Sequence, residues 1–314
     1  MNPTRCIAAI SFVLKRRIYD IQDKSQPAYG SSRRGMTPSY RKGTMKMTKQ
    51  HFGTALVTGA SSGIGAIYAD RLARRGYDLI LVARNRARLD ELAARISDET
   101  GRSVEVVTAD LGQGADVRRV ADILKTDHSI TTLVNNAGVG ATVPALQSDI
   151  DAMEAMIGLN VNALTRLTYA ALPGFVARGQ GLIVNISSIG AIAPEVLNGV
   201  YGGTKAFVLA LTQSLHKELA GTGVNVQVVL PGATATEFWN AAGTPVEHLP
   251  SEIVMKAADM VDAALAGLDQ GELVTIPSLP DVADWEAYEN ARHALMPNLS
   301  RSLPAARYTN GDLT

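Results

Sequence analysis

From residue 53 onward, short runs of mostly apolar residues alternate with longer segments whose apolar residues recur at helical spacing. The short runs are nearly continuous in apolar residues, as is typical of strands that are buried on both faces of a parallel sheet. The expected strands are 53–58, 78–83, 104–108, 131–135, 181–186, 224–230 and 272–276. The expected helices are approximately 64–75, 86–99, 115–126, 149–172, 201–220 and 251–268.

This alternation predicts consecutive βαβ units and therefore an α/β fold, a doubly wound, mainly parallel sheet with helices on both faces. No internal repeat and no obvious linker interrupts residues 51–314, so one domain over 51–280 suffices. Residues 281–314 are expected to form a C-terminal extension that packs on the domain or on a neighbouring subunit, because Trp285, Tyr288 and Arg292 stand at helical spacing.

Residues 1–50 differ in composition from the rest of the chain. They carry 11 Lys and Arg against two Asp, a net charge of +9, and the remainder of this neutral chain carries −9. The apolar stretch Cys6–Leu14 is followed rather than preceded by a basic cluster, unlike a secretory signal. The composition of 22–50 predicts disorder. Three interpretations compete: a targeting presequence, a basic tail with a binding or scaffold role, or an upstream-start artefact. The last is favoured, because Met45 or Met47 would begin a compact domain just before its first strand.

The composition also excludes several classes of function. Cys6 is the single cysteine, so an internal disulfide is impossible and a reducing compartment, the cytoplasm, is expected. The five histidines include no pair at metal-ligand spacing, and no metal site is expected. No apolar run approaches the roughly 20 residues of a membrane helix. The acidic body argues against nucleic acid or anionic membranes as partners, which leaves a small-molecule substrate.

A glycine-rich turn, Thr58–Gly65, joins the first expected strand to the first expected helix. Gly59 allows the tight turn, Gly63 lets the backbone approach a pyrophosphate, and Gly65 lets the helix pack closely on the strand. The free N–H groups of the helix start favour phosphate. Glycines alone are weak evidence, but the position between strand and helix is the context that the motif requires. The expected cofactor-binding residues here are Gly59, Ser61, Ser62, Gly63, Ile64 and Gly65.

The end of the second expected strand bears on the choice of cofactor. A carboxylate there would bind the ribose 2′-hydroxyl of NAD. This chain has Arg84 and Arg88 instead, with no acid before Asp90. Guanidinium groups suit a 2′-phosphate, so NADP(H) is expected in preference to NAD(H). The alternative is that these arginines face solvent at a helix start.

Tyr201 and Lys205 lie four residues apart on an expected helix and hence on one face. An ammonium about 4 Å from the phenol, at an effective dielectric constant near 20, would favour the phenolate by about 4 kcal/mol and lower the tyrosine pKa by about three units. Such a tyrosine is suited to general acid/base work on an alcohol or a carbonyl. Ser188, thirteen residues earlier at the end of an expected strand, is placed to hold the substrate oxygen. Alternatively, Ser187 and Ser188 form a helix cap or turn, for which Ser187 is the better candidate.

Taken together, these motifs resemble a classical short-chain dehydrogenase/reductase over about residues 51–280. The matching residues, in the family's order and approximate spacing, are Thr58–Gly65, Asp110-Leu111, Asn135-Asn136-Ala137-Gly138, Asn160, Ser188, Tyr201, Lys205, Pro231-Gly232 and Thr236. The resemblance implies a Rossmann-type, seven-stranded sheet and an NADP-dependent oxidoreductase that forms a homodimer or homotetramer through the helices at 149–172 and 201–220. Thr204, where the family more often has serine, keeps the hydroxyl.

The resemblance also implies a role for each residue. Ser188 would orient the carbonyl, Tyr201 would exchange the proton, and Lys205 would lower the Tyr201 pKa and hold the nicotinamide ribose. Asn160 would help to anchor a proton-relaying water, although a buried asparagine that bridges helix and sheet is the alternative. The remaining cofactor contacts would be Asp110 and Leu111 at the adenine, Asn136, Ala137 and Gly138 near the adenosine ribose, and Pro231, Gly232 and Thr236 at the nicotinamide end.

The choice of substrate is expected to lie in residues 140–147, 189–199 and 237–250, which contain no Lys or Arg. A neutral, moderately apolar ketone, aldehyde or secondary alcohol is therefore expected. The residues that suggest an apolar pocket are Ile192, Val196, Phe238, Trp239 and Leu249. Phe238 and Trp239 fit a plain core position equally well. The alternative function is a redox-silent NADP(H)-binding regulatory protein on the same fold.

Overall fold

A computed structural model describes residues 52–309 of the chain. This part divides into two compact units, one ending at Pro277 and the other beginning at Ser278, and each is described by itself. The expectations for residues 1–50 concern a segment outside the described residues.

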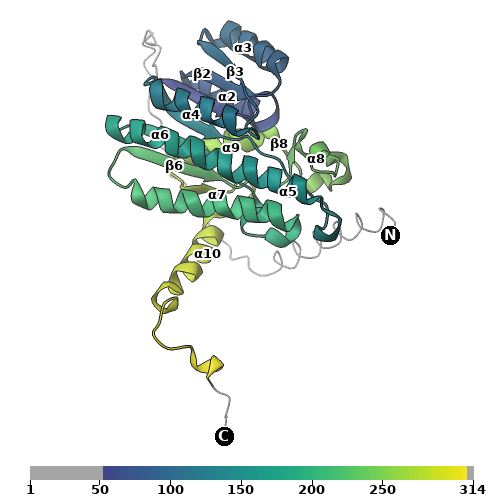
Figure 1. The fold of residues 1–314 in the computed structure, drawn as a ribbon, viewed down its shortest axis with the longest axis vertical. Helices are drawn as coiled ribbons and strands as arrows, with labels where there is room; N and C mark the ends of the chain where they lie inside the picture. Colours follow the sequence, from purple (N-terminus) through teal and green to yellow (C-terminus); the bar gives the residue numbers. More distant parts are fainter. Residues whose placement is uncertain (1–51, 310–314) are drawn as a thin grey trace, which may run out of the picture. The chain divides into compact units, whose positions relative to one another are not determined.

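The first unit is built on a seven-stranded sheet in which all neighbouring strands are parallel (Figure 1). The strands are β1 (Thr54–Thr58), β2 (Asp78–Ala83), β3 (Val104–Thr108), β4 (Ile130–Asn135), β5 (Gly181–Ile186), β6 (Val224–Val229) and β9 (Val274–Thr275). Their order across the sheet is β3-β2-β1-β4-β5-β6-β9. The chain thus builds one half of the sheet outward from β1 and then the other half from β4, which confirms the doubly wound fold.

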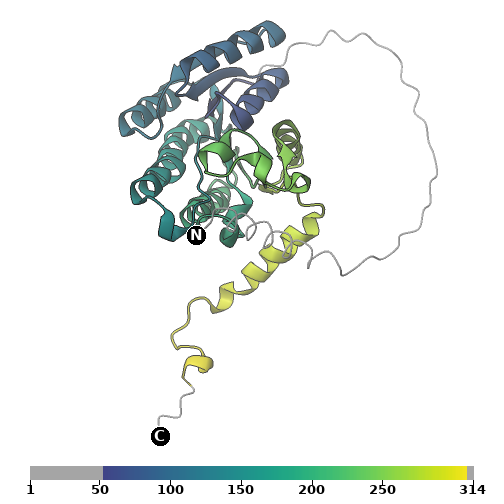
Figure 2. The same cartoon turned by 90° about the vertical axis from the view of Figure 1, so that its right-hand side faces the viewer.

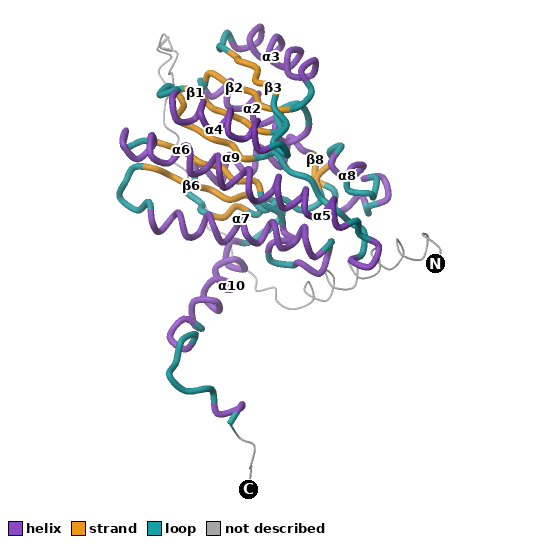
Figure 3. Tube along the Cα trace, in the orientation of Figure 1, coloured by secondary structure: helices purple, strands orange, loops and turns teal. Residues whose placement is uncertain are grey.

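Helices cover both faces of this sheet (Figures 2 and 3). They are α2 (Gly63–Arg75), α3 (Arg86–Thr100), α4 (Gly114–Thr126), α5 (Ile150–Ile157), α6 (Leu164–Arg178), α7 (Gly199–Glu218), α8 (Phe238–Ala241) and α9 (Ala257–Asp269). One core cluster joins α2, α3 and α9 to the sheet, and a second joins α4, α6 and α7. Successive strand residues alternate between the two clusters, Val57 in the first and Leu56 in the second, as the two-residue period of a strand requires.

Two of the expected helices differ from the structure. The segment expected at 149–172 consists of α5, one π-helical turn at Gly158–Ala163, and α6, which continues to Arg178. The helix expected from residue 251 begins only at Ala257. Residues just before it form the short strand β8 (Met255–Lys256), which pairs in parallel with β7 (Thr234–Ala235). That pairing connects residues about twenty positions apart and is invisible to a local pattern.

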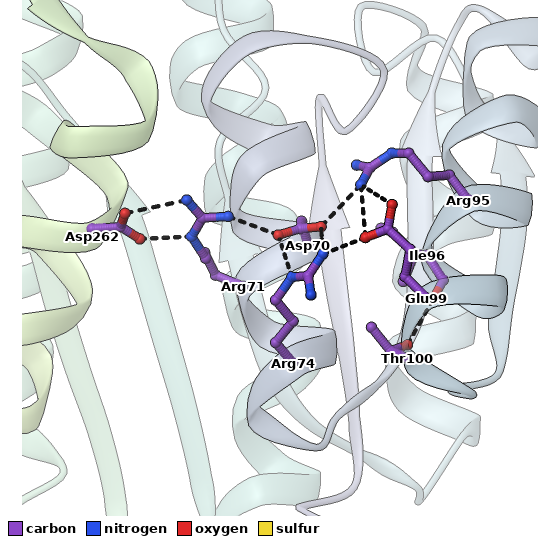
Figure 4. A network of polar contacts seen from close by, with 8 residues as sticks. All are labelled: Asp70, Arg71, Arg74, Arg95, Ile96, Glu99, Thr100 and Asp262. Carbon is purple, nitrogen blue, oxygen red and sulfur yellow. Dashed lines mark hydrogen bonds and ion pairs between the residues drawn. The ribbon is translucent and has the colours of Figure 1, made fainter.

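On the face of the sheet that α2, α3 and α9 cover, a network of charged side chains connects α2 to the other two helices (Figure 4). Asp70, whose side chain is buried, accepts hydrogen bonds from Arg71, Arg74 and Arg95 at 2.8, 3.0 and 3.1 Å. Arg71 also reaches Asp262 on α9, at 2.7 Å. Burial opposes ionisation of Asp70, but the three arginines outweigh it, and its pKa lies below the usual value.

The second unit contains α10 (Val282–Ala294), in which the rings of Trp285 and Tyr288 stack with centroids 5.2 Å apart. The second unit by itself buries none of the side chains of α10. Across residues 52–309, no helix combines the length and the apolar character needed to span a membrane.

Candidate active site

Tyr201 and Lys205 lie on α7, and both side chains are buried. The helix begins at Gly199 because the Asn198 side chain caps it, accepting from the N–H groups of Val200 and Tyr201. The cap places Tyr201 in the first turn. Lys205 follows one turn later and points its ammonium at the end of β5, where Nζ donates to the Ile186 carbonyl at 3.0 Å.

Ser188 is the second residue after β5 and lies beside Tyr201: a Cβ placed on Gly190 would be 3.6 Å from both the Ser188 Oγ and the Tyr201 ring. Its Oγ also accepts from the Gly190 N–H at 3.1 Å and so caps a short 3₁₀ turn. The cap role, for which Ser187 was the better candidate, thus belongs to Ser188. Ser187 instead donates to the carbonyl of Lys205 at 2.8 Å, which fixes α7 against the end of β5.

The electrostatics of the tyrosine–lysine pair run opposite to the expectation. Burial raises the pKa of Tyr201 to about 12, and the hydrogen bond with Ser188 offsets only part of that rise. Burial lowers the pKa of Lys205 to about 8. The Lys205 Nζ lies 5.7 Å from the centre of the Tyr201 ring and is engaged with a carbonyl. Desolvation of both groups therefore outweighs their mutual attraction in the protein alone.

Asn160 is buried within the π turn between α5 and α6. Its Oδ1 accepts from the Val139 N–H at 3.0 Å, and its Nδ2 donates to the Val139 carbonyl and to the Thr204 hydroxyl. Both N–H groups of the amide are thus used, and one lone pair of Oδ1 is left. A Cβ placed on Gly138 would lie 3.1 Å from that Oδ1 and 3.5 Å from the Lys205 Nζ, so these groups enclose one small space.

The glycine-rich turn has the geometry of a phosphate cradle. Gly59 and Gly63 have positive φ values of 64° and 54°, and a Cβ on Gly65 would overlap the Gly59 carbonyl. Asn136 braces the turn, donating from Nδ2 to the carbonyl of Thr58 at 2.9 Å. The predicted members beside the glycines, Ser61, Ser62 and Ile64, are half-buried.

The start of α2 is also free to receive an anion. Ser62 precedes the helix without capping it, and the first turn holds no acid. The first N–H groups of a helix have no partner within it, so an uncapped start favours phosphate oxygens. The residues present therefore fit a dinucleotide pyrophosphate.

The other predicted cofactor residues lie around this turn. Thr236 faces it, with its Cγ2 3.2 Å from a Cβ placed on Gly63. Ala137 and Asn136 both donate their N–H groups to the Thr58 hydroxyl at 3.0 Å. The remaining residues follow the ends of β3 and β6: Asp110, whose Oδ1 accepts from the Gly112 N–H, buried Leu111, buried Pro231 and half-buried Gly232.

The two arginines after β2 are not equivalent. Arg84 is exposed and makes no side-chain hydrogen bond or ion pair within residues 52–309. Arg88 forms a bidentate ion pair with Glu237, with Nη1 2.7 Å from Oε2 and Nη2 3.1 Å from Oε1. Sequence reasoning did not identify Glu237, because nothing local connects residues 149 positions apart.

Phe238 and Trp239 separate into the two roles that the sequence left open. The Phe238 ring lies 5.9 Å from that of Tyr201, beside the candidate acid/base. Trp239 is buried and donates from Nε1 to the Thr234 carbonyl at 2.9 Å, a core position. A Cβ on Gly140 would overlap the Phe238 ring, so this glycine gives the ring its place. Gly140 is the first residue of the segment 140–147 that was expected to select the substrate, but its contact with the Phe238 ring was not expected.

Comparison with known proteins agrees with this geometry. Residues 53–246 match the short chain dehydrogenase family. A short-chain dehydrogenase from Sphingobium yanoikuyae, solved in complex with NADPH, is 50% identical with a TM-score of 0.80, over 82% of this chain and 100% of that one. A bulky-bulky ketone specific alcohol dehydrogenase from Comamonas testosteroni is 44% identical with a TM-score of 0.76, over 82% and 99% of the two chains. An uncharacterised oxidoreductase of Staphylococcus epidermidis is 34% identical over 234 residues, 73% of this chain and 96% of its own.

The parallel sheet, the glycine-rich turn and these relatives define an oxidoreductase of the Rossmann type. The chain belongs to the short-chain dehydrogenase family.

Proposed function

We propose that the protein transfers a hydride between NADP(H) and a neutral, moderately apolar ketone, aldehyde or secondary alcohol, with Tyr201 as the general acid/base. The observation that carries the proposal is the convergence of two buried residues, Tyr201 and Ser188, beside Phe238: a Cβ placed on Gly190 would lie 3.6 Å from both the Ser188 Oγ and the Tyr201 ring. Two hydroxyls that converge in an apolar setting suit a carbonyl oxygen, because both can donate to it.

In this proposal the cofactor supplies or accepts the hydride, and the chain's own residues hold it. The glycine-rich turn and the start of α2 bind the pyrophosphate. Arg84 and Arg88 bind the 2′-phosphate, which favours NADP(H) over NAD(H). The NADPH complex of the Sphingobium yanoikuyae relative supports this preference. The other proposed contacts are Asp110 and Leu111 at the adenine, Asn136, Ala137 and Gly138 near the adenosine ribose, and Pro231, Gly232 and Thr236 at the nicotinamide end.

The pKa of about 12 means that Tyr201 is protonated at neutral pH. It is thus ready to give its proton to a carbonyl oxygen that is being reduced, while Ser188 orients that oxygen. Lys205, with a pKa of about 8, is mostly charged at neutral pH and stabilises the phenolate as it forms. The remaining lone pair of Asn160 Oδ1 anchors a water through which Lys205 returns a proton to Tyr201.

The proposed substrate class follows from the surroundings of Tyr201. The three flanking segments contain no Lys or Arg to bind a carboxylate or phosphate. Phe238 supplies an apolar face, and Gly140 leaves room for that ring. The Comamonas testosteroni relative is specific for bulky-bulky ketones. A ketone with apolar groups on both sides of the carbonyl is therefore the first substrate to test.

The test is NADPH oxidation over a panel of aldehydes and ketones, with Tyr201→Phe beside the wild type. Removing a general acid is expected to lower kcat by about 10²- to 10⁴-fold, with the Kd for NADPH unchanged. Tyr169→Phe, the same change on an exposed tyrosine of α6, is the matched control and is expected to retain full turnover.

Turnover that survives Tyr201→Phe would contradict the assigned role of the tyrosine. Tight NADPH binding by the wild type, without turnover of any panel compound, would favour the redox-silent regulatory protein.

A further inference from the structure

The ion pair between Arg88 and Glu237 joins two parts of the proposed site that are far apart in the chain. Arg88 stands in the first turn of α3, beyond the end of β2, where the 2′-phosphate is proposed to bind. Glu237 directly precedes α8, whose first residue is Phe238. Hydrogen bonds from Arg88 lower the pKa of the Glu237 carboxyl, so the pair is fully charged at neutral pH.

The segment that carries Phe238 is held at both ends. At its far end, Thr142 donates from its N–H to the Ala242 carbonyl at 3.0 Å, and its hydroxyl lies 2.9 Å from that of Thr244. At its near end, the Trp239 indole donates to the Thr234 carbonyl, and the Glu237 side chain is held by the ion pair with Arg88, called the near anchor below. Of these contacts, the near anchor alone depends on a guanidinium that has another proposed ligand.

The Glu237 carboxylate occupies the part of Arg88 that a phosphate would use. A guanidinium binds a carboxylate or a phosphate through the same two-pronged set of N–H groups. Both terminal nitrogens of Arg88 are engaged by Glu237. The carboxylate would also repel a phosphate placed beside it. Exposed ion pairs are weak, so a phosphate of higher charge is able to displace this one.

We propose that Glu237 is a specificity-determining residue that competes with the cofactor's 2′-phosphate for Arg88. When a 2′-phosphorylated nucleotide binds, Arg88 turns to the phosphate, and the near anchor of the segment carrying Phe238 is released. Binding of the 2′-phosphate is thereby coupled to the position of the Phe238 side chain, which lies beside Tyr201. The inference rests on the proposed preference for NADP(H).

The first measurement is calorimetric binding of 2′,5′-ADP and of 5′-AMP, two probes that lack nicotinamide and differ in the 2′-phosphate. Glu237→Gln removes the competing charge and is expected to tighten 2′,5′-ADP binding by about two- to fivefold, the range for losing an exposed ion pair. Binding of 5′-AMP is expected to stay the same. Glu247→Gln, on an exposed glutamate of the same loop, is the matched control and is expected to change neither.

Unchanged or weaker 2′,5′-ADP binding by Glu237→Gln would overturn the inference and leave the NADP(H) preference standing. A wild-type protein that bound both nucleotides equally would overturn the preference, and the inference with it.

The second measurement follows the segment itself. The chain has two tryptophans, so in a Trp285→Phe background Trp239, next to Phe238, is the sole tryptophan reporter. Addition of 2′,5′-ADP is expected to change the fluorescence of Trp239, whereas addition of 5′-AMP is expected to leave it unchanged. In the added presence of Glu237→Gln, where the near anchor is already absent, the change is expected to be lost. An equal fluorescence change in the parent protein and in the Glu237→Gln variant would overturn the coupling.

Discussion

The Nζ atom of Lys205 lies 3.0 Å from the carbonyl oxygen of Ile186, the last residue of β5, and donates a hydrogen bond to it. This bond uses one of the three N–H donors of the ammonium, in a site that solvent scarcely reaches. It also holds the lysine side chain at the carboxyl end of β5, close to Ser188. Burial nevertheless disfavours the charge and lowers the pKa of Lys205 to about 8.

The rate of carbonyl reduction is therefore expected to depend on pH through Lys205. Below about pH 8 the lysine is charged and stabilises the negative charge that forms on Tyr201. Above that pH the lysine is neutral, and this electrostatic stabilisation is lost. We expect kcat to fall as the pH rises through about 8. Lys205→Met is expected to have low kcat throughout, without that inflection. Kinetics between about pH 6 and pH 10 check this. An inflection near pH 8 that persists in the variant would rule out Lys205 as its source.

Gly140 and Phe238 are expected to be energetically coupled. A Cβ at residue 140 overlaps the Phe238 ring, so Gly140→Ala displaces the ring from its place beside Tyr201. We expect Gly140→Ala to lower kcat/KM for a bulky ketone by at least about tenfold, a magnitude ordinary for misplacement near the chemistry. In a Phe238→Ala background the same change is expected to have little effect. Additive effects of the two substitutions would contradict the coupling.

Asp70 is expected to make stability depend on pH at the acid end. Its folded pKa lies below the usual value, so its contribution is present above the unfolded pKa of about 3.9 and is lost as pH falls through the folded value. Asp70→Asn is expected to lower the free energy of unfolding at pH 7 by about 1.5–3 kcal/mol, the range for hydrogen bonds to charged groups.

Urea titrations of wild type and Asp70→Asn at pH 7 and near pH 3 measure this difference. The difference between the two proteins is expected to be smaller at the lower pH. Asp122→Asn, on an exposed acid of α4 paired with Lys125, is the control and is expected to change little. A deficit of the same size at both pH values would show that Asp70 acts through packing and not through its charge.

The C-terminal unit is expected to be covered by a second copy of the chain in a homodimer or homotetramer. The unit by itself leaves its apolar side chains uncovered, with Leu299 at 68% and Leu303 at 78% exposed. Burying one leucine contributes about 1.5–3 kcal/mol, so Leu303→Asp is expected to weaken association between about 10-fold and 100-fold. Light scattering after size exclusion, across a dilution series, checks this. Ser302→Asp is the neighbouring control, and a monomeric wild type would contradict the expectation.

The strands were predictable because strands buried on both faces of the sheet consist of nearly continuous apolar residues, a pattern that stands out in the sequence. The seven expected strands are all present, and only the last is much shorter, at Val274–Thr275. Failures came where long-range pairing decides the structure. The start of α9 was placed six residues early, because the pairing of Met255–Lys256 with Thr234–Ala235 cannot be read from either segment. The π turn within 149–172 was not expected either, and Asn160 within it is hydrogen-bonded to Val139, 21 positions away.

In the candidate site, the sequence indicated which residues meet but not the environment in which they meet. Ser188, Tyr201 and Lys205 converge as their spacing predicted. The direction of the Tyr201 pKa was wrong, because the expectation assigned a moderately polar medium to groups that are almost fully buried. Glu237 was expected only as part of the substrate-selecting segment 237–250, and not as a partner of Arg88. Its role depends on a partner from α3, which only the folded chain brings near.

The π turn at Gly158–Ala163 separates the placement of Asn160 from the packing of the two helices that flank it. Such a turn is equivalent to one extra residue inserted into an α-helix, and the bulge absorbs that residue. Deletion of one residue here would therefore restore a regular helix and leave Met153 and Leu167 facing their own cores. What the deletion would remove is the set of hydrogen bonds that Asn160 makes with Val139 and Thr204. A chain shortened at this turn should thus keep its fold while losing part of its site.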